Sequence, residues 1–140
     1  MKLLFVCRGN VGRSQMAAAF YNQLTSTKDA DSAGTQVEKP GQTLLERKKE
    51  RPGKSFVVDA MHEAGINVES CKSTQLTKEV LPKYDLVISM AGKRYTPEWL
   101  AEAPNYTYWK IQDPMARSYA ITARARDNIE QMVKSLAESQ

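Results

Sequence analysis

The junction between an apolar run and the stretch after it is the strongest constraint on the fold of this chain. Residues 3–6, Leu-Leu-Phe-Val, are apolar enough for a buried strand. After Ser14 the apolar residues recur at helical spacing, at Met16, Ala17, Phe20, Tyr21 and Leu24. A strand-to-helix loop therefore lies between them, with the sequence Cys7-Arg8-Gly9-Asn10-Val11-Gly12-Arg13-Ser14. We expect its two glycines to take positive φ angles and its N–H groups to converge in front of the helix, which favours an oxyanion.

Four side chains of this octet suit chemistry on an oxyanion. N–H groups and a helix end that attract an anion also stabilise a thiolate, so Cys7 is a candidate nucleophile. The planar fork of Arg13 can hold two oxygens of a tetrahedral oxyanion through the transition state. The Ser14 hydroxyl can donate to the sulfur, and Asn10 tolerates left-handed backbone while its amide holds the loop. The predicted phosphate-binding residues are Arg8, Gly9, Asn10, Val11, Gly12, Arg13 and Ser14.

Two other interpretations of the octet are weaker. The segment Gly9-x-x-Gly12-Arg13-Ser14 is shorter by two residues than an ATP-type phosphate-binding loop and lacks its lysine. A buried cysteine that ends a strand before an ordinary helix-capping turn is the plainer alternative, since cysteine is often buried. We favour the catalytic interpretation because glycine, asparagine, arginine and serine accompany Cys7 at this junction.

The rest of the chain alternates between strand-like and helical segments. The predicted strands span residues 2–7, 31–33, 86–90 and 106–111. The predicted helices begin at Ser14, span residues 55–64, follow Thr96-Pro97 and span residues 118–136. This alternation predicts an α/β fold with a parallel sheet covered on both faces, and ligands of such sheets bind at the carboxyl ends of the strands, where Cys7 falls.

Asp113 is the candidate general acid. It follows the predicted strand at residues 106–111, so it is expected at the same edge of the sheet as Cys7. Pro114 stiffens the turn that presents it. A thiolate that attacks a phosphate monoester needs such a proton donor for the leaving oxygen.

The octet resembles the signature of the low-molecular-weight protein tyrosine phosphatases and the thioredoxin-type arsenate reductases, which share one fold. Further similarities follow in family order: Ser32-Ala33-Gly34-Thr35, Ala64-Gly65-Ile66, Cys71-Lys72-Ser73, Tyr84-Asp85-Leu86-Val87-Ile88 and Asp113-Pro114. The resemblance implies a single domain over residues 1–140, with three α/β/α layers around a central four-stranded parallel sheet. It also implies a phosphomonoester hydrolase that forms a phosphocysteine, with Cys7 as nucleophile, Arg13 on the phosphate and Asp113 as general acid and base.

Departures from the family pattern keep two alternatives open. Gly12 stands where a second cysteine is usual, Gln15 replaces a common proline, and residues 115–117, Met-Ala-Arg, contain no aromatic side chain of the kind that stacks on phosphotyrosine. No cysteine occurs in residues 89–94, where the reductases carry their relay, and Cys71 is expected to be structural. The alternatives are an arsenate reductase resolved by an external thiol, of the glutathione, glutaredoxin or mycothiol type, and a non-catalytic oxyanion-binding protein.

Net charge and composition limit the kinds of substrate and partner that we expect for this chain. A net charge of +4 suits a phosphorylated protein, a phosphorylated small molecule or another oxyanion as substrate. Much of this charge lies in residues 47–54, expected as an exposed loop or an extended helix end rather than a nucleic-acid site, since no aromatic residues interleave the charges. With two cysteines and no membrane-length apolar run or signal peptide, we expect a cytoplasmic protein without membrane contacts. We expect no metal or other cofactor, a surface position for His62, and a monomer or weak dimer.

Overall fold

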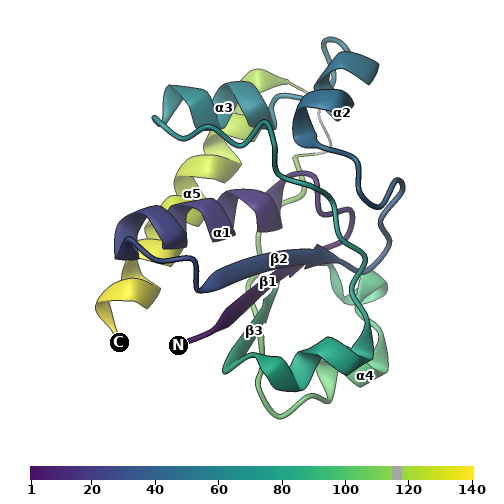
Figure 1. Cartoon of the computed structure of the whole chain (residues 1–140), viewed down its shortest axis with the longest axis vertical. Helices are drawn as coiled ribbons and strands as arrows, with labels where there is room; N and C mark the ends of the chain where they lie inside the picture. The colour runs from purple at the N-terminus through teal and green to yellow at the C-terminus, as the bar shows by residue number, and fades with distance from the viewer. Residues whose placement is uncertain (115–117) are drawn as a thin grey trace.

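Within the described residues, 1–114 and 118–140, the computed structural model contains a sheet of four parallel strands (Figure 1). β1 (Leu3–Cys7) lies between β2 (Ala30–Gly34) and β3 (Leu86–Ser89), and β4 (Tyr106–Tyr108) pairs with the other side of β3. This arrangement confirms the predicted α/β fold with a four-stranded parallel sheet. Because the strands are parallel, the segments that follow β1, β3 and β4 meet at one edge of the sheet.

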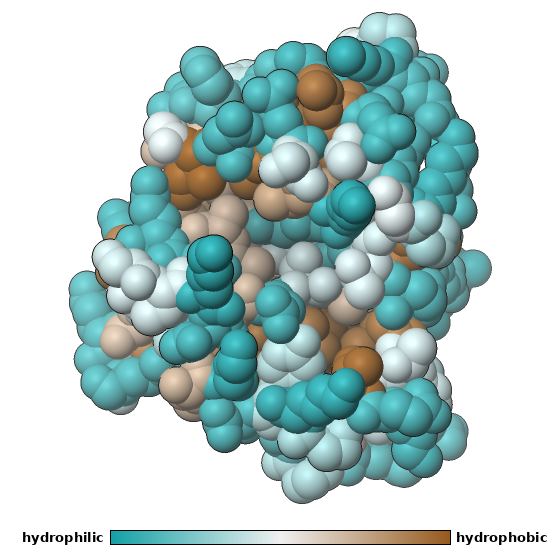
Figure 2. Space-filling view, in the orientation of Figure 1, coloured by the Kyte–Doolittle hydropathy of each residue, from teal (hydrophilic) through white to brown (hydrophobic). Residues whose placement is uncertain are grey.

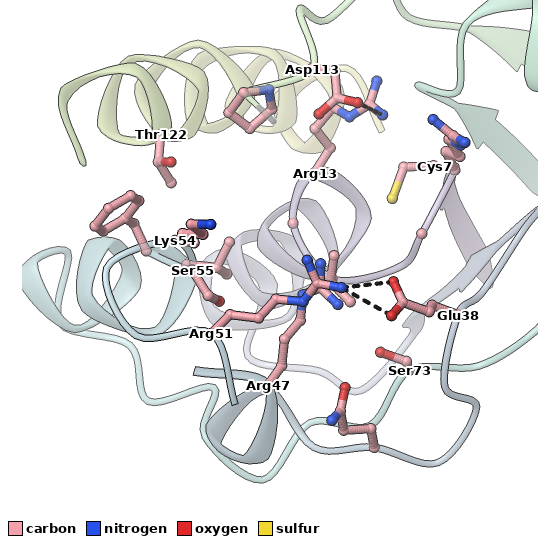
Figure 3. Close-up of a pocket in the computed structure, with 18 of the residues that line it drawn as sticks. Cys7, Arg13, Glu38, Arg47, Arg51, Lys54, Ser55, Ser73, Asp113 and Thr122 are labelled. Atoms are coloured by element: carbon pink, nitrogen blue, oxygen red, sulfur yellow. Dashed lines mark hydrogen bonds and ion pairs between the residues drawn. The ribbon is translucent and has the colours of Figure 1, made fainter. Parts of the chain in front are cut away.

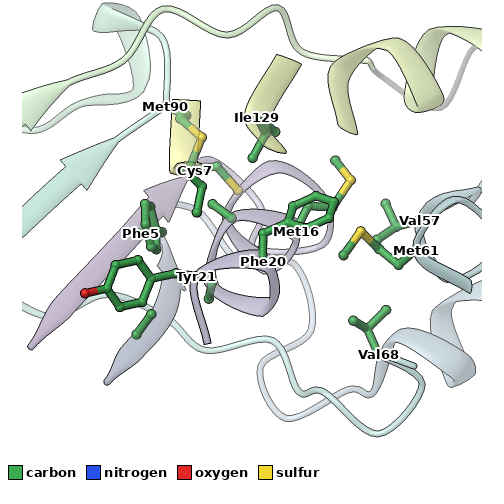
Figure 4. Close-up of a cluster of buried hydrophobic side chains, with 14 of the residues drawn as sticks. Phe5, Cys7, Met16, Phe20, Tyr21, Val57, Met61, Val68, Met90 and Ile129 are labelled. Atoms are coloured by element: carbon green, nitrogen blue, oxygen red, sulfur yellow. The ribbon is translucent and has the colours of Figure 1, made fainter. Parts of the chain in front are cut away.

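The side chains of β1 alternate between the two faces of the sheet, and all five are buried. Leu3, Phe5 and Cys7 belong to the larger core, which α1 (Arg13–Thr25) and α5 (Tyr119–Glu138) cover (Figure 4). The buried residues that helices contribute to this core include Met16, Ala17, Phe20, Tyr21, Val57, Met61, Ile129 and Val133.

Leu4 and Val6 point to the opposite face and form a second, smaller core. The other buried members of this core are Ala33, Leu76, Leu81, Val87 and Leu100. They come in part from the 3₁₀ helix η1 (Lys78–Lys83) and from α4 (Glu98–Ala101), a single turn that follows the 3₁₀ turn η2 (Lys93–Tyr95). Helical segments therefore lie on both faces of the sheet, with the longer helices on the α1 and α5 side.

A separate helix, α2 (Leu44–Glu50), stands where the sequence suggested only a loop or an extended helix end. The Thr43 hydroxyl accepts a hydrogen bond from the N–H of Glu46, and the Glu46 carboxylate accepts one from the N–H of Thr43, both at 3.1 Å. This capping box fixes the start of the helix, and hydrogen bonding by Thr43, first through its backbone N–H, lowers the pKa of the Glu46 carboxyl group. α2 packs against α3 (Val57–Glu63), which in turn packs against α5.

One strand is clearly shorter than predicted. The strand predicted at residues 106–111 ends at Tyr108, because Tyr108 pairs with Ser89, the last residue of β3. The helix predicted to follow Thr96-Pro97 is α4, which begins at Glu98; Pro104 soon follows it, where a proline disfavours helical backbone in the residue before it. The predicted start at Ser14 and the predicted spans 55–64 and 118–136 agree with α1, α3 and α5 to within two residues.

The surface is mainly polar. On the face shown in Figure 2, hydrophilic residues dominate and apolar residues appear only in small, separate groups. Of the large apolar residues described, Met1 and Leu24 are the exposed ones. Among the helices of the described residues, none combines the length and apolar character that crossing a membrane requires.

Candidate active site

The loop between β1 and α1 surrounds the sulfur of Cys7 with hydrogen-bond donors. Cys7 is the last residue of β1 and is buried. The N–H of Asn10 donates to its Sγ at 3.3 Å, and Ser14 Oγ lies 3.0 Å from the same sulfur. The Ser14 oxygen accepts a hydrogen bond from Asn10 Nδ2 at 2.8 Å, so its own proton can point to the sulfur. From these positions both groups can stabilise the charge that develops on the sulfur during attack and departure.

Asn10, and not a glycine, supplies the left-handed backbone of this loop. Its φ is 54°, whereas Gly12 has a φ of −140° and Gly9 also lies outside the left-handed region. The prediction that the two glycines take positive φ was therefore wrong. The side chain of Asn10 accounts for the difference, because asparagine tolerates this conformation when its amide is hydrogen-bonded locally.

A network around Asn10 joins the loop to the segment that contains Ser73. The Asn10 carbonyl accepts hydrogen bonds from Gln15 Nε2 at 3.1 Å and from Ser73 Oγ at 3.2 Å. Asn10 Oδ1 accepts from the N–H of Thr74 at 2.8 Å, and Gln15 also donates to the Lys72 carbonyl at 3.1 Å. Gln15, noted in the sequence only as a departure from the family pattern, thus holds the loop to its neighbour.

Arg13 connects the loop to the ends of the other strands. One terminal nitrogen of its guanidinium donates to the carbonyl of Met90 and, at 3.4 Å, to that of Ile111. The other terminal nitrogen lies 3.5 Å from a carboxylate oxygen of Asp113. The Arg13 side chain is 7% exposed and that of Asp113 is 43% exposed. Arg13 therefore lies in the buried wall of the site and Asp113 at its solvent-exposed mouth. The three residues predicted as catalytic, Cys7, Arg13 and Asp113, thus lie together (Figure 3).

These residues line a cleft of about 550 Å³. Of the predicted phosphate-binding residues, Arg8, Gly9, Val11, Gly12 and Arg13 line the cleft, whereas Asn10 and Ser14 are fully buried behind it. Arg8 stacks on Tyr95, with its guanidinium carbon 4.0 Å from the ring centroid. Residues 115–117 contain no aromatic side chain in the sequence, and they lie outside the described residues.

One wall of this cleft was not predicted from the sequence. Arg47, Arg51 and Lys54, from α2 and the segment after it, line the cleft together with Ser55 and Phe56. The interpretation of residues 47–54 as only a solvated loop or helix end was therefore incomplete. The capping box that begins at Thr43 would have indicated the helix, and helical spacing would then have placed Arg47 and Arg51 on one side of it.

Cys71 does not line the cleft. It is half-buried, has a free thiol and packs against the larger core. Burial raises the pKa of its thiol, which keeps it protonated near neutral pH. His62 is exposed, as expected. Among the described residues, no three His, Cys, Asp or Glu side chains are arranged to hold a metal ion.

Gly34 is expected to tolerate no side chain, because it packs against the loop. A Cβ at this position would lie 2.8 Å from the Arg8 carbonyl oxygen, 2.8 Å from a methyl group of Val37 and 2.9 Å from the Asn10 nitrogen. We expect Gly34→Ala to lower the free energy of unfolding by about 1–3 kcal/mol and to reduce turnover, since the loop backbone must shift. Urea denaturation and steady-state kinetics measure both effects.

Gly92→Ala is the matched control for this substitution. A Cβ on Gly92 would have only the Tyr95 ring in contact, at 3.9 Å, and its φ of −56° suits alanine. A Gly34→Ala protein as stable and as active as Gly92→Ala would contradict the close packing described above.

Comparison with known proteins covers nearly the whole chain. The family described as low molecular weight phosphotyrosine protein phosphatase matches residues 2–140. The glutaredoxin arsenate reductase of Synechocystis sp. is 29% identical over 138 residues, which cover 96% of this chain and 95% of that protein. The protein-arginine-phosphatase of Bacillus subtilis is 27% identical over 150 residues, with coverage of 99% and 95%. An arsenate reductase solved in its phosphate-binding state is 26% identical, with a TM-score of 0.73 and coverage of 99% and 98%.

Proposed function

Since the chain belongs to the low molecular weight phosphotyrosine protein phosphatase family, whose members include arsenate reductases and arginine phosphatases, we propose that it is a phosphomonoester hydrolase acting through a phosphocysteine. The proposal depends mainly on the groups that surround the sulfur of Cys7. Its sulfur lies within 3.3 Å of two hydrogen-bond donors, in the cleft that Arg13 and Asp113 also line. The arsenate reductase solved in its phosphate-binding state supports phosphate as the oxyanion for this cleft.

The proposed reaction has two steps. In the first, Cys7 Sγ forms a bond to phosphorus while the bond from phosphorus to the leaving oxygen breaks, and Asp113 donates its proton to that oxygen. In the second, Asp113 takes a proton from water, the water oxygen bonds to phosphorus and the sulfur–phosphorus bond breaks. Inorganic phosphate leaves and the Cys7 thiolate is restored.

Arg13 and the loop amides stabilise the charge on the transferred group in both steps. The hydrogen bonds from the Arg13 guanidinium to the backbone carbonyls of Met90 and Ile111 fix the position of this group before substrate arrives. In the second step the Ser14 hydroxyl donates a hydrogen bond to the departing sulfur, because its oxygen lies 3.0 Å from Sγ.

Asp113→Asn is expected to reduce hydrolysis most for substrates whose leaving group must be protonated as it departs. For phenyl phosphate we expect kcat/KM to fall by about 10³-fold, and for p-nitrophenyl phosphate by only about tenfold, because nitrophenolate leaves without protonation. Steady-state kinetics with both substrates measure the difference. Equal losses for the two substrates would show that Asp113 acts only by holding Arg13, its partner at 3.5 Å.

Turnover of p-nitrophenyl phosphate in the presence of EDTA tests the function itself. Hydrolysis by the wild-type protein, measured across pH 5 to 8, is the expected result. A folded wild-type protein without any turnover would exclude the phosphatase and leave the second candidate.

The second candidate is an arsenate reductase, which relatives such as the Synechocystis enzyme favour. In that reaction Cys7 Sγ would bond to arsenic and displace a water. An external thiol would then attack Sγ, so that As(V) leaves as As(III) and a mixed disulfide forms, which a second thiol reduces. Cys71 is unsuited to the resolving role, because it packs against the core and does not line the cleft. Arsenite production from arsenate with glutathione and glutaredoxin, or with mycothiol, tests this candidate.

A further inference from the structure

The cleft carries more positive charge than one phosphoryl group requires. Its described lining includes six cationic side chains and only two carboxylates. The cations are Arg8, Arg13, Lys39, Arg47, Arg51 and Lys54, and the carboxylates are Glu38 and Asp113. In the proposed reaction, Arg13 and the loop amides already bind the transferred phosphoryl group, so the remaining cations need another explanation.

Ion pairs account for two of these remaining cations. Arg51 donates to both carboxylate oxygens of Glu38, at 2.9 and 3.0 Å, and Lys39 forms an ion pair with Glu50. The side chains of Arg47 and Lys54, in contrast, form no hydrogen bond or ion pair with the part of the chain that the structure describes. Figure 3 shows Arg47, on α2, and Arg51, at the C-terminal end of this helix, extending toward the hollow that Cys7 faces, with Lys54 on the same side.

The charge of Arg47 is partly desolvated. The side chain is half-buried, and burial, followed by the like charge of Arg51, lowers its pKa, although Glu38 and Glu50 act in the opposite direction. Arg51 is the residue that caps the C-terminal end of α2, and its own charge is already paired with Glu38. An anion bound at Arg47 would compensate a guanidinium that the protein leaves without a close partner.

We propose that Arg47 and Lys54 form a second anion subsite in the cleft, which selects substrates that carry an anionic group besides the transferred phosphoryl group. This inference rests on the proposed phosphatase function. The second group is a carboxylate or a phosphate, and it has two sources. It is either an acidic side chain beside the phosphorylated residue of a protein, or a second anionic substituent of a small phosphomonoester.

Two pairs of substrates test the subsite and distinguish the sources. One pair consists of phosphotyrosine peptides of equal length, flanked by Asp and Glu or by Asn and Gln. The other pair is 3-carboxyphenyl phosphate and phenyl phosphate. We expect the wild-type protein to prefer the acidic member of at least one pair by about tenfold in kcat/KM, and the double variant Arg47→Gln/Lys54→Gln to bring this ratio close to one. The pair that shows the preference identifies the source.

Matched controls separate the subsite from general electrostatic attraction. Arg124 is exposed on α5, and Lys49 lies on α2; neither lines the cleft. The double variant Arg124→Gln/Lys49→Gln removes the same charge and is expected to retain the wild-type ratio. The ratio is also expected to fall as ionic strength rises.

Two outcomes would overturn the proposal: equal kcat/KM within both pairs for the wild-type protein, or the same preference in the Arg47→Gln/Lys54→Gln variant. Calorimetric binding of the same pairs to the Cys7→Ser variant tests the subsite without turnover. If the wild-type protein hydrolyses none of the four compounds while this variant binds the acidic members more tightly, the phosphatase function fails and the subsite stands. Equal binding within both pairs would exclude the subsite as well.

Discussion

Replacement of Cys7 by serine is expected to reduce the hydrolysis of p-nitrophenyl phosphate by about 10⁴-fold or more. The Asn10 N–H and the Ser14 hydroxyl face the sulfur at 3.3 and 3.0 Å, an arrangement that favours an anionic atom. A serine hydroxyl has a far higher pKa than a thiol, so it is a far weaker nucleophile while the cleft retains its shape.

Cys71→Ser is the matched control, because it removes the other thiol at a site outside the cleft. It is expected to keep turnover within about twofold of the wild-type value. Calorimetry with inorganic phosphate shows whether Cys7→Ser still folds and binds the oxyanion. Substantial turnover by Cys7→Ser, or its loss in Cys71→Ser, would contradict the assignment of the nucleophile.

Arg13→Lys is expected to lower kcat by about 10³-fold although the positive charge is retained. The guanidinium contacts Met90, Ile111 and Asp113 with its two terminal nitrogens, and a lysine has one nitrogen and no fixed fork. The variant should therefore lose both the two-point hold on phosphate and the fixed position of the charge.

Steady-state kinetics with p-nitrophenyl phosphate, together with inhibition by inorganic phosphate, measure this effect. Arg124→Lys, on the exposed side of α5, is the matched control and is expected to behave as the wild type. An Arg13→Lys protein within tenfold of the wild-type kcat would show that charge alone is sufficient at this position.

The sequence was sufficient for the features that depend on local pattern. The apolar run at residues 3–6 and the helical spacing after Ser14 predicted β1, α1 and the loop between them. The position of Asp113 just after a strand predicted that it would share an edge of the sheet with Cys7, and the structure places it 3.5 Å from Arg13. Each of these predictions needs only the direction of parallel strands and the short reach of the chain.

Features that depend on tertiary contacts were missed or predicted wrongly. Whether Asn10 or a glycine takes the left-handed conformation depends on partners at Gln15, Ser73 and Thr74, two of which are distant in the sequence. The wall formed by Arg47 and Lys54 depends on how α2 packs, which the charges of this segment do not reveal. The requirement for glycine at position 34 likewise depends on the backbone of Arg8 and Asn10 across the sheet edge.

Trapping of the covalent intermediate tests the central proposal most directly. The Asp113→Asn variant, mixed with p-nitrophenyl phosphate and quenched in acid, is expected to carry one phosphoryl group on the peptide that contains Cys7, because the second step lacks its base. Mass spectrometry of the digested protein detects the modification, which should be absent when Cys7→Ala is added. A phosphoryl group on any other residue, or active protein that never accumulates one, would contradict a mechanism through phosphocysteine.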